Sequence, residues 1–180
     1  MKLKLILVFL LPMFLFFSCE KEDPVIPNEE ELITTLIFTL QPVTGGDAIE
    51  FKFQDIDGDG GNPPEISTAP LLANTTYSGT LTFLNELNTP ALDITEEVKD
   101  EAESHQVFYQ SAMYPLTITY EDEDSNGNPL GVKTTVVTST AGTGELTIIL
   151  RHLPIKPNNG NPSEAGGETD IEVTFPVVVK

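Results

Sequence analysis

The sequence predicts an all-β fold, built as an antiparallel β-sandwich of about seven or eight strands with one short helix. Three observations lead to this prediction. Short segments rich in β-branched and aromatic residues recur along the chain. Several of them alternate apolar and polar residues, as strands with one buried face do. Turns rich in glycine, proline and asparagine separate the segments, which is typical of sandwiches.

The expected strands alternate most clearly in two places. In residues 48–54, Ile49 and Phe53 share a face with Phe51, opposite charged residues. In residues 75–84, a face of Tyr77, Gly79, Leu81 and Phe83 opposes serine and threonine. The full set of expected strands is 32–40, 48–54, 75–84, 107–109, 116–121, 132–138, 145–151 and 171–179. Such a set favours an immunoglobulin-like or transthyretin-like sandwich.

One segment, near residues 94–104, departs from the strand pattern and predicts a short helix. Asp93 is a suitable N-cap, and acidic residues including Glu96 occupy the first turn, where they complement the helix dipole. Ile94, Val98 and Ala102 fall on one helical face. We expect this face to pack on the sheet.

The first 30 residues have the organisation of an export signal followed by a tether. Two lysines precede an uncharged run at residues 5–17, which is short for a membrane-spanning helix. Ser18-Cys19 follows, and a small residue before cysteine in this context resembles the lipobox of bacterial lipoproteins. The resemblance implies lipidation of Cys19 and cleavage of residues 1–18 as a signal peptide. The acidic and proline-containing composition of residues 19–30 indicates a tether, and we expect residues 31–180 to form a single domain. The alternative is an ordinary signal peptide with an incidental thiol.

Composition narrows the functional classes. The formal net charge of −19 disfavours nucleic acids and favours cations or basic partners. The single cysteine excludes an intramolecular disulfide and a thiolate zinc site within the chain. The sequence contains no nucleophile elbow, phosphate-binding glycine loop or metalloprotease helix motif. We therefore expect a non-catalytic protein, with an envelope hydrolase as a distant alternative.

Two acidic loops are candidate calcium sites. Asp55, Asp57 and Asp59 alternate before Gly60, and Asp122, Asp124 and Asn126 alternate before Gly127. Oxygen ligands at this spacing suit calcium, although neither loop has the glutamate that ends an EF-hand loop. The alternative is a pair of polar turns, since Asp-Gly and Asn-Gly are favoured turn sequences.

The two histidines, His105 and His152, are candidate ligands for zinc or copper. Their separation in the chain matches no ligand spacing, so this interpretation requires the fold to bring them together. The alternative is two separate, solvated histidines at the ends of a helix and a strand. The long loop at residues 153–169 is either mobile or a recognition element.

The mature chain resembles small acidic lipoproteins of Bacteroidota that are catalogued as "type 1 periplasmic binding fold superfamily protein". The resemblance rests on Thr75-Thr76-Tyr77, on residues 105–109, on the 120–131 loop and on residues 167–171. It implies a cell-envelope accessory role beside an outer-membrane transporter. The family label implies two α/β lobes, whereas the residue pattern predicts a sandwich. We expect an outer-membrane-anchored binding or accessory module, stabilised by calcium if the acidic loops bind it, or alternatively a metal-capture lipoprotein.

Overall fold

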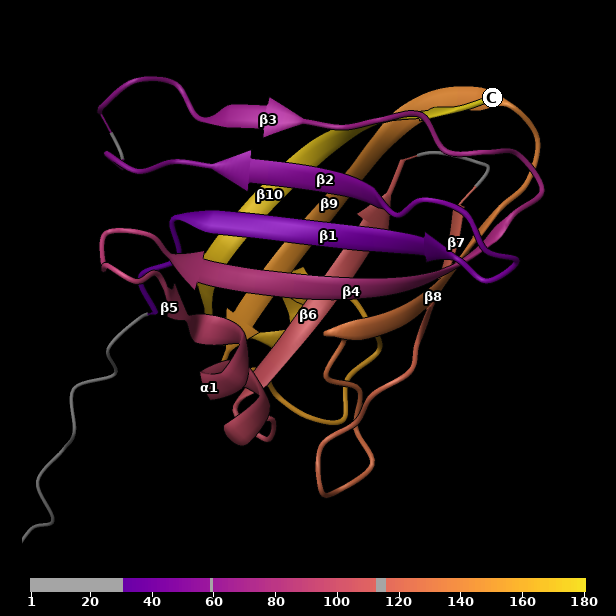
Figure 1. The fold of residues 1–180 in the computed structure, drawn as a ribbon. Helices are drawn as coiled ribbons and strands as arrows, with labels where there is room; N and C mark the ends of the chain where they lie inside the picture. Colours follow the sequence, from indigo (N-terminus) through magenta and orange to yellow (C-terminus); the bar gives the residue numbers. More distant parts are fainter. Residues whose placement is uncertain (1–30, 59, 113–115) are drawn as a thin grey trace, which may run out of the picture.

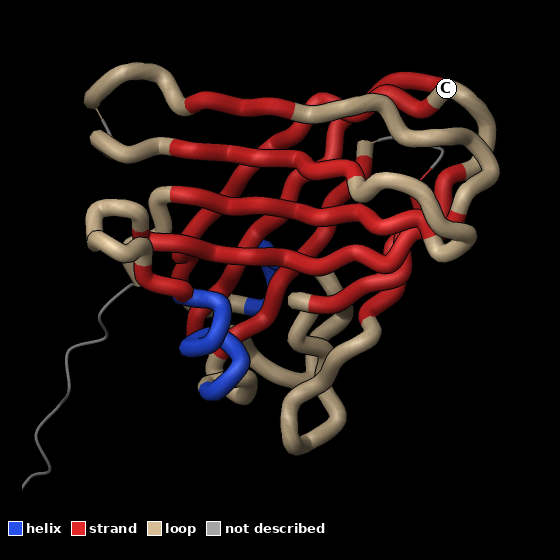
Figure 2. The backbone as a smooth tube through the Cα atoms, in the orientation of Figure 1, coloured by secondary structure: helices blue, strands red, loops and turns tan. Residues whose placement is uncertain are grey.

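The computed structural model describes residues 31–58, 60–112 and 116–180, which form two antiparallel β-sheets packed face to face (Figure 1). Strands dominate and helices are confined to two short segments (Figure 2). The prediction of an antiparallel β-sandwich is therefore confirmed. The expected lipidation site Cys19, the signal peptide and the tether lie outside the described residues.

The larger sheet has seven strands, six of them in the order β3-β2-β1-β4-β8-β7. In that order the strands are Glu65–Ser67, Ile49–Gln54, Thr35–Pro42, Thr76–Asn85, Lys133–Thr138 and Leu116–Tyr120. The seventh, β5 (Leu92–Asp93), pairs with the end of β4. The central strands β1 and β4 pair over eight residues, from Thr35 opposite Leu84 to Pro42 opposite Tyr77.

The smaller sheet has the order β10-β9-β6, with strands at Glu168–Val179, Gly142–His152 and His105–Ser111. Strands β6 and β9 run antiparallel, and their register places His105 directly opposite His152. Side chains alternate between faces along a strand. The two histidines therefore share the inner face with Val107 and Leu150, which are fully buried.

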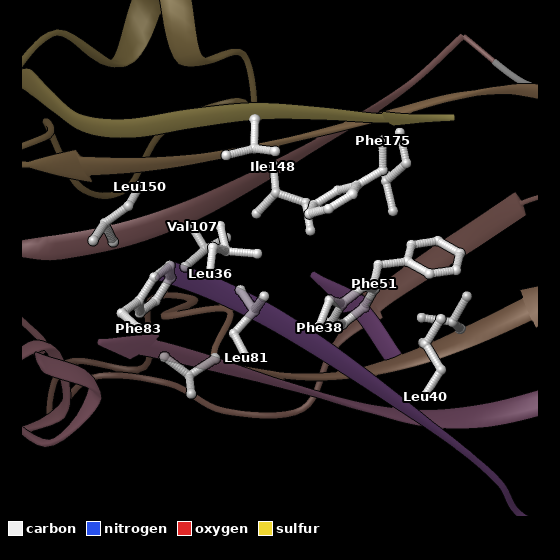
Figure 3. Close-up of a cluster of buried hydrophobic side chains, with 14 of the residues drawn as sticks. Leu36, Phe38, Leu40, Phe51, Leu81, Phe83, Val107, Ile148, Leu150 and Phe175 are labelled. Carbon is white, nitrogen blue, oxygen red and sulfur yellow. The ribbon is translucent and has the colours of Figure 1, made fainter. Parts of the chain in front are cut away.

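The core fills the space between the two sheets (Figure 3). Phe38, Phe51 and Phe83 enter it from the larger sheet, and Ile148 and Phe175 enter it from the smaller one. The expected inward face of β4 is confirmed, because Tyr77, Gly79, Leu81 and Phe83 are all buried. Burial of such large apolar side chains supplies the main driving force for folding.

The predicted helix is present as α1 (Ile94–Asp100), which packs beside β4. Asp93 caps it by accepting a hydrogen bond of 2.9 Å from the backbone N–H of Thr95. Ile94 and Val98 are buried in the core and Ala102 packs partly against it, as expected. The helix ends earlier than predicted, with Glu101 as its C-cap, so that Ala102 lies in the following turn.

Other boundaries also differ from the prediction. The structure adds the short strands β3 and β5, and a second helix, α2 (Pro162–Ala165), interrupts the expected 153–169 loop. β3 and β5 carry little apolar alternation, and α2 is a single turn capped by Asn161, so periodicity alone does not reveal them. In the described part of the chain, no helix has the length and apolar character needed to cross a membrane.

Candidate metal centre

Four residues with metal-ligating side chains meet at one end of the sandwich. His105 begins β6, His152 ends β9, Glu31 precedes β1 and Glu101 caps the C-terminus of α1. One possible ligand atom from each residue lies within 4.8 Å of those of the others. Both sheets and the helix therefore contribute to the same cluster. No other group of three or more such residues occurs in the ranges that the structure describes.

The two imidazole rings are stacked. Their centroids are 4.6 Å apart and their planes differ by 10°. His105 is fully buried and His152 is 8% exposed. The Nδ1 atom of His152 is buried and finds no hydrogen-bond partner among the described residues. A buried nitrogen without a partner is costly, which indicates a missing ligand or a functional role.

A backbone contact sets the orientation of the His105 ring. Its Nδ1 lies 3.2 Å from the carbonyl oxygen of Glu101. A carbonyl can only accept a hydrogen bond, so Nδ1 must be the donor. In the neutral ring, Nε2 then carries a free lone pair. Histidines that bind metals commonly donate their other ring N–H to a backbone carbonyl in this way.

Glu31 faces that lone pair. Its Oε1 lies 2.9 Å from Nε2 of His105, and its side chain is only 6% exposed. Despite the short distance, the contact does not have the angles of a hydrogen bond. Nε2 therefore has no hydrogen-bond partner among the described residues. Glu31 Oε2 is likewise buried without a partner in that part of the chain. The two atoms lie at ion-pair distance, and either a proton on Nε2 or a metal cation beside them would relieve the repulsion between their lone pairs.

Glu101 differs from the other three residues because it is exposed. It gives the cluster one carboxylate on the solvent side, whereas the imidazoles and Glu31 are enclosed. A tetrahedral zinc ion with bonds of about 2.0–2.1 Å separates its donor atoms by roughly 3.3 Å. To surround one ion, the more distant donor atoms of the cluster would move modestly inward, whereas Nε2 of His105 and Oε1 of Glu31, at 2.9 Å, would move slightly apart.

The donor set restricts the chemistry of this site. Two imidazoles and two carboxylates, without a thiolate, suit zinc or divalent copper better than soft monovalent copper. Calcium is disfavoured here because it prefers sites built from oxygen ligands alone. The structure thus brings together both histidines that the sequence singled out, and it adds two glutamates to them.

The first acidic loop, after β2, forms turns with its own carboxylates. Asp55 accepts a hydrogen bond of 2.9 Å from the backbone of Gly58. Asp57 accepts 3.0 Å and 2.7 Å bonds from the backbone and side chain of Asn62, and these lower its pKa. Asp59 lies outside the described residues. Calcium binding in this loop stays a prediction.

The second acidic loop, between β7 and β8, is organised in the same manner. Asp122 accepts backbone hydrogen bonds from Gly131 and Lys133, at 2.7 Å and 2.8 Å. Asp124 is buried and accepts 2.9 Å bonds from the backbones of Asn126 and Asn128. Burial alone would raise the pKa of Asp124, but these bonds and Lys156 outweigh it and lower the pKa. These contacts close the loop without an ion, and calcium binding by Asp122, Asp124 and Asn126 stays a prediction.

Sequence reasoning found the histidines but missed Glu31 and Glu101. Both glutamates stand in acidic stretches, where a carboxylate usually faces solvent. Glu31 stands at the expected start of the domain, and Glu101 lies in the predicted helix. Only the position of Glu101 offered a signal in the sequence, because it lies four residues before His105 and could have been considered as a neighbouring ligand.

Comparison of the chain with protein-family models, with curated proteins and with solved structures finds no match.

Proposed function

We propose that this protein is a cell-envelope module that binds a divalent transition metal, zinc or copper, through His105, His152 and Glu31, with Glu101 on the solvent side. The observation that carries the proposal is the convergence of possible ligand atoms from all four residues within 4.8 Å, with Nδ1 of His152 and Oε2 of Glu31 buried and without hydrogen-bond partners among the described residues. The ion pair between His105 and Glu31 leaves Oε2 of Glu31 and Nδ1 of His152 without partners in the described part of the chain, and a metal ion would give these buried atoms a partner.

The number of possible ligands at the site supports binding rather than catalysis. A catalytic zinc ion keeps an open coordination position for water or substrate, with three protein ligands. Here a fourth possible ligand, the carboxylate of Glu101, is close enough to complete the set. The role proposed for the chain is therefore capture of the ion, without a reaction on a substrate.

We propose further that the module is held at the outer membrane by a lipid on Cys19. The support is the sequence around Cys19, where an apolar run and Ser18 precede the cysteine and an acidic stretch follows it. A strongly acidic domain at the cell surface or in the periplasm would attract cations from the surrounding medium. Replacement of Cys19 by serine should release the protein from the membrane fraction.

Titration calorimetry of residues 19–180 with Zn²⁺ and with Cu²⁺, with calcium as a comparison, tests the metal proposal. We expect one ion per chain. Saturation at about 100 times the dissociation constant should add about 2.7 kcal/mol to the free energy of unfolding. For a domain of this size the melting temperature should then rise by roughly 5–11 °C.

A double variant, His105→Ala with His152→Ala, should lose both the heat of binding and the thermal shift. The matched control is Asp55→Asn with Asp57→Asn, which changes the first acidic loop and leaves the histidines intact. If the control loses zinc and the histidine variant keeps it, the proposed site is wrong.

A further inference from the structure

The metal site adjoins an acidic hollow, and the two share Glu101. The hollow measures about 590 Å³ and lies between the end of α1 and the loop that joins β7 and β8. Its acidic lining residues are Asp100, Glu101, Glu103, Glu123 and Asp124. Both segments lie at the same end of the sandwich (Figure 1).

Specific contacts hold the two walls of the hollow together. Lys156 donates a 2.7 Å hydrogen bond to the carbonyl of Ala102 and lies 3.3 Å from Asp124 Oδ2. Ser125 donates a hydrogen bond to Glu103. These contacts connect the turn after α1 to the acidic loop, so the hollow has a defined shape.

Acidic residues outnumber basic residues in the lining of the hollow. Lys99 is the one basic residue in its lining, and it forms an ion pair of 2.9 Å with Glu96, which lies outside the lining. Lys156, next to the hollow, forms an ion pair with Asp124. Asp100, Glu103 and Glu123 are exposed. A concave surface with excess charge of one sign concentrates counter-ions and can raise association rates by about 10- to 1,000-fold.

The ligands themselves show a gradient of burial. His105 is fully buried, the Glu31 side chain is 6% exposed and His152 is 8% exposed, whereas Glu101 is open to solvent. The unpartnered buried atoms, Glu31 Oε2 and His152 Nδ1, lie at the enclosed end of this series. Among the four proposed ligands, Glu101 is therefore the one most accessible to an ion that arrives from solvent.

We infer that the acidic hollow is the access route of the site: it gathers divalent cations, and Glu101 passes them to His105, His152 and Glu31. This inference rests on the proposed function. It makes the bound ion exchangeable, since the same exposed carboxylate that admits the ion also lets it leave. The chain would thus act as a carrier of zinc or copper, and the ion would not be a permanent structural element.

Stopped-flow mixing of the protein with Zn²⁺, with a chromogenic chelator that reports free zinc, tests the inference. The test variant carries Asp100→Asn, Glu103→Gln and Glu123→Gln, none of which is a proposed ligand. Its association rate constant should fall at least about fivefold at low ionic strength, and the deficit should shrink at about 0.5 M salt, where the Debye length is only a few ångströms.

The matched control removes the same charge from the opposite end of the sheets, through Asp47→Asn, Glu50→Gln and Glu145→Gln, all at exposed residues. It should lose clearly less of the association rate than the test variant, because the attraction between a charge and an approaching ion weakens with distance. Circular dichroism melting of both variants checks that they fold.

The outcomes separate the two proposals. A wild-type chain that takes up no zinc overturns the proposed function, and the access route with it. The access route is wrong, and the metal site remains, if the protein binds zinc at its histidines but the association rate constants of the test and control variants fall equally or do not fall.

Discussion

His105 and His152 lie face to face across strands β6 and β9, with ring centroids 4.6 Å apart and planes within 10° of parallel. They are separated by nearly fifty residues of sequence, and the register of the smaller sheet alone brings them together. Because both rings point into the sandwich, they occupy positions where apolar side chains would stabilise the core more. Binding of a ligand by the two rings would explain why polar residues occupy these positions.

The first prediction concerns the His152 ring as a ligand. His152→Phe keeps an aromatic ring against His105 but removes both nitrogen atoms, so the metal-free protein should melt within a few degrees of the wild type. Loss of a partner that only orients a ligand lowers metal affinity by about 10- to 100-fold, and loss of a direct ligand should cost at least as much. Calorimetry with zinc measures the change. An unchanged zinc affinity would remove His152 from the site.

The second prediction separates binding from stability at Glu31. Glu31→Gln retains the shape of the side chain and removes a buried carboxylate that lacks a partner on Oε2. The metal-free protein should be about as stable as the wild type, because the amide N–H of the glutamine can donate a hydrogen bond to Nε2 of His105. Zinc affinity should fall by at least about tenfold. Urea unfolding and zinc titration of the same sample give both values.

The opposite pattern would contradict the account. If Glu31→Gln strongly destabilises the metal-free chain while zinc affinity is retained, Glu31 serves the fold as a partner of His105 and does not bind the ion.

The third prediction concerns acid stability at Asp124. The folded protein lowers the pKa of this carboxyl below its ordinary value of 3.8, because hydrogen bonds from Asn128 and Asn126 outweigh the cost of burial. A group with a lowered folded pKa stabilises the protein fully above its unfolded pKa, and this contribution is lost as pH falls through the folded pKa. Asp124→Asn should therefore flatten the decline in stability below about pH 4.

Chemical unfolding at a series of pH values between about 2.5 and 7 measures this slope. Asp47→Asn, at an exposed position, is the control and should keep the wild-type slope. If the free energy of unfolding falls with decreasing pH in the same way for the Asp124 variant and the wild type, the carboxylate does not contribute to stability.

The fourth prediction tests the packing between β4 and β1. A Cβ atom at Gly79 would lie 2.8 Å from the Phe38 ring, and it would also press on the hydroxyl of Thr134. Because the ring is fully buried, it has no free space into which to move. Gly79→Ala should cost about 1–3 kcal/mol in unfolding free energy, the usual range for overpacking.

Ser78→Ala is the matched control for this prediction, because Ser78 precedes Gly79 on β4 and is exposed. It should change stability by no more than about 0.5 kcal/mol. Equal effects of the two substitutions would contradict the packing described here.

Sequence patterns predicted much of this fold because local physics determines it. The alternation of Tyr77 and Leu81 with polar residues indicated a strand with one buried face, and both side chains are buried. Asp93 was recognisable as an N-cap because its side chain acts on the next turn of the chain. Such signals involve residues that are close in sequence.

The metal centre depends on contacts between distant residues, and for that reason much of it was not predictable. Register between β6 and β9 decides whether His105 faces His152, and no pattern in either strand specifies that register. Glu31 reaches the site only because β1 lies in the opposing sheet. The acidic loops were easier to single out as calcium candidates, since a spacing within one segment is easier to recognise than the convergence of four segments.

The most direct test of the central claim is anomalous X-ray diffraction at the zinc edge from crystals of the zinc-loaded protein. The account predicts one strong peak about 2.0–2.2 Å from a ring nitrogen of His105, a ring nitrogen of His152 and a carboxylate oxygen of Glu31. Zinc found only at the two acidic loops, with the stacked histidines and Glu31 unchanged, would contradict it.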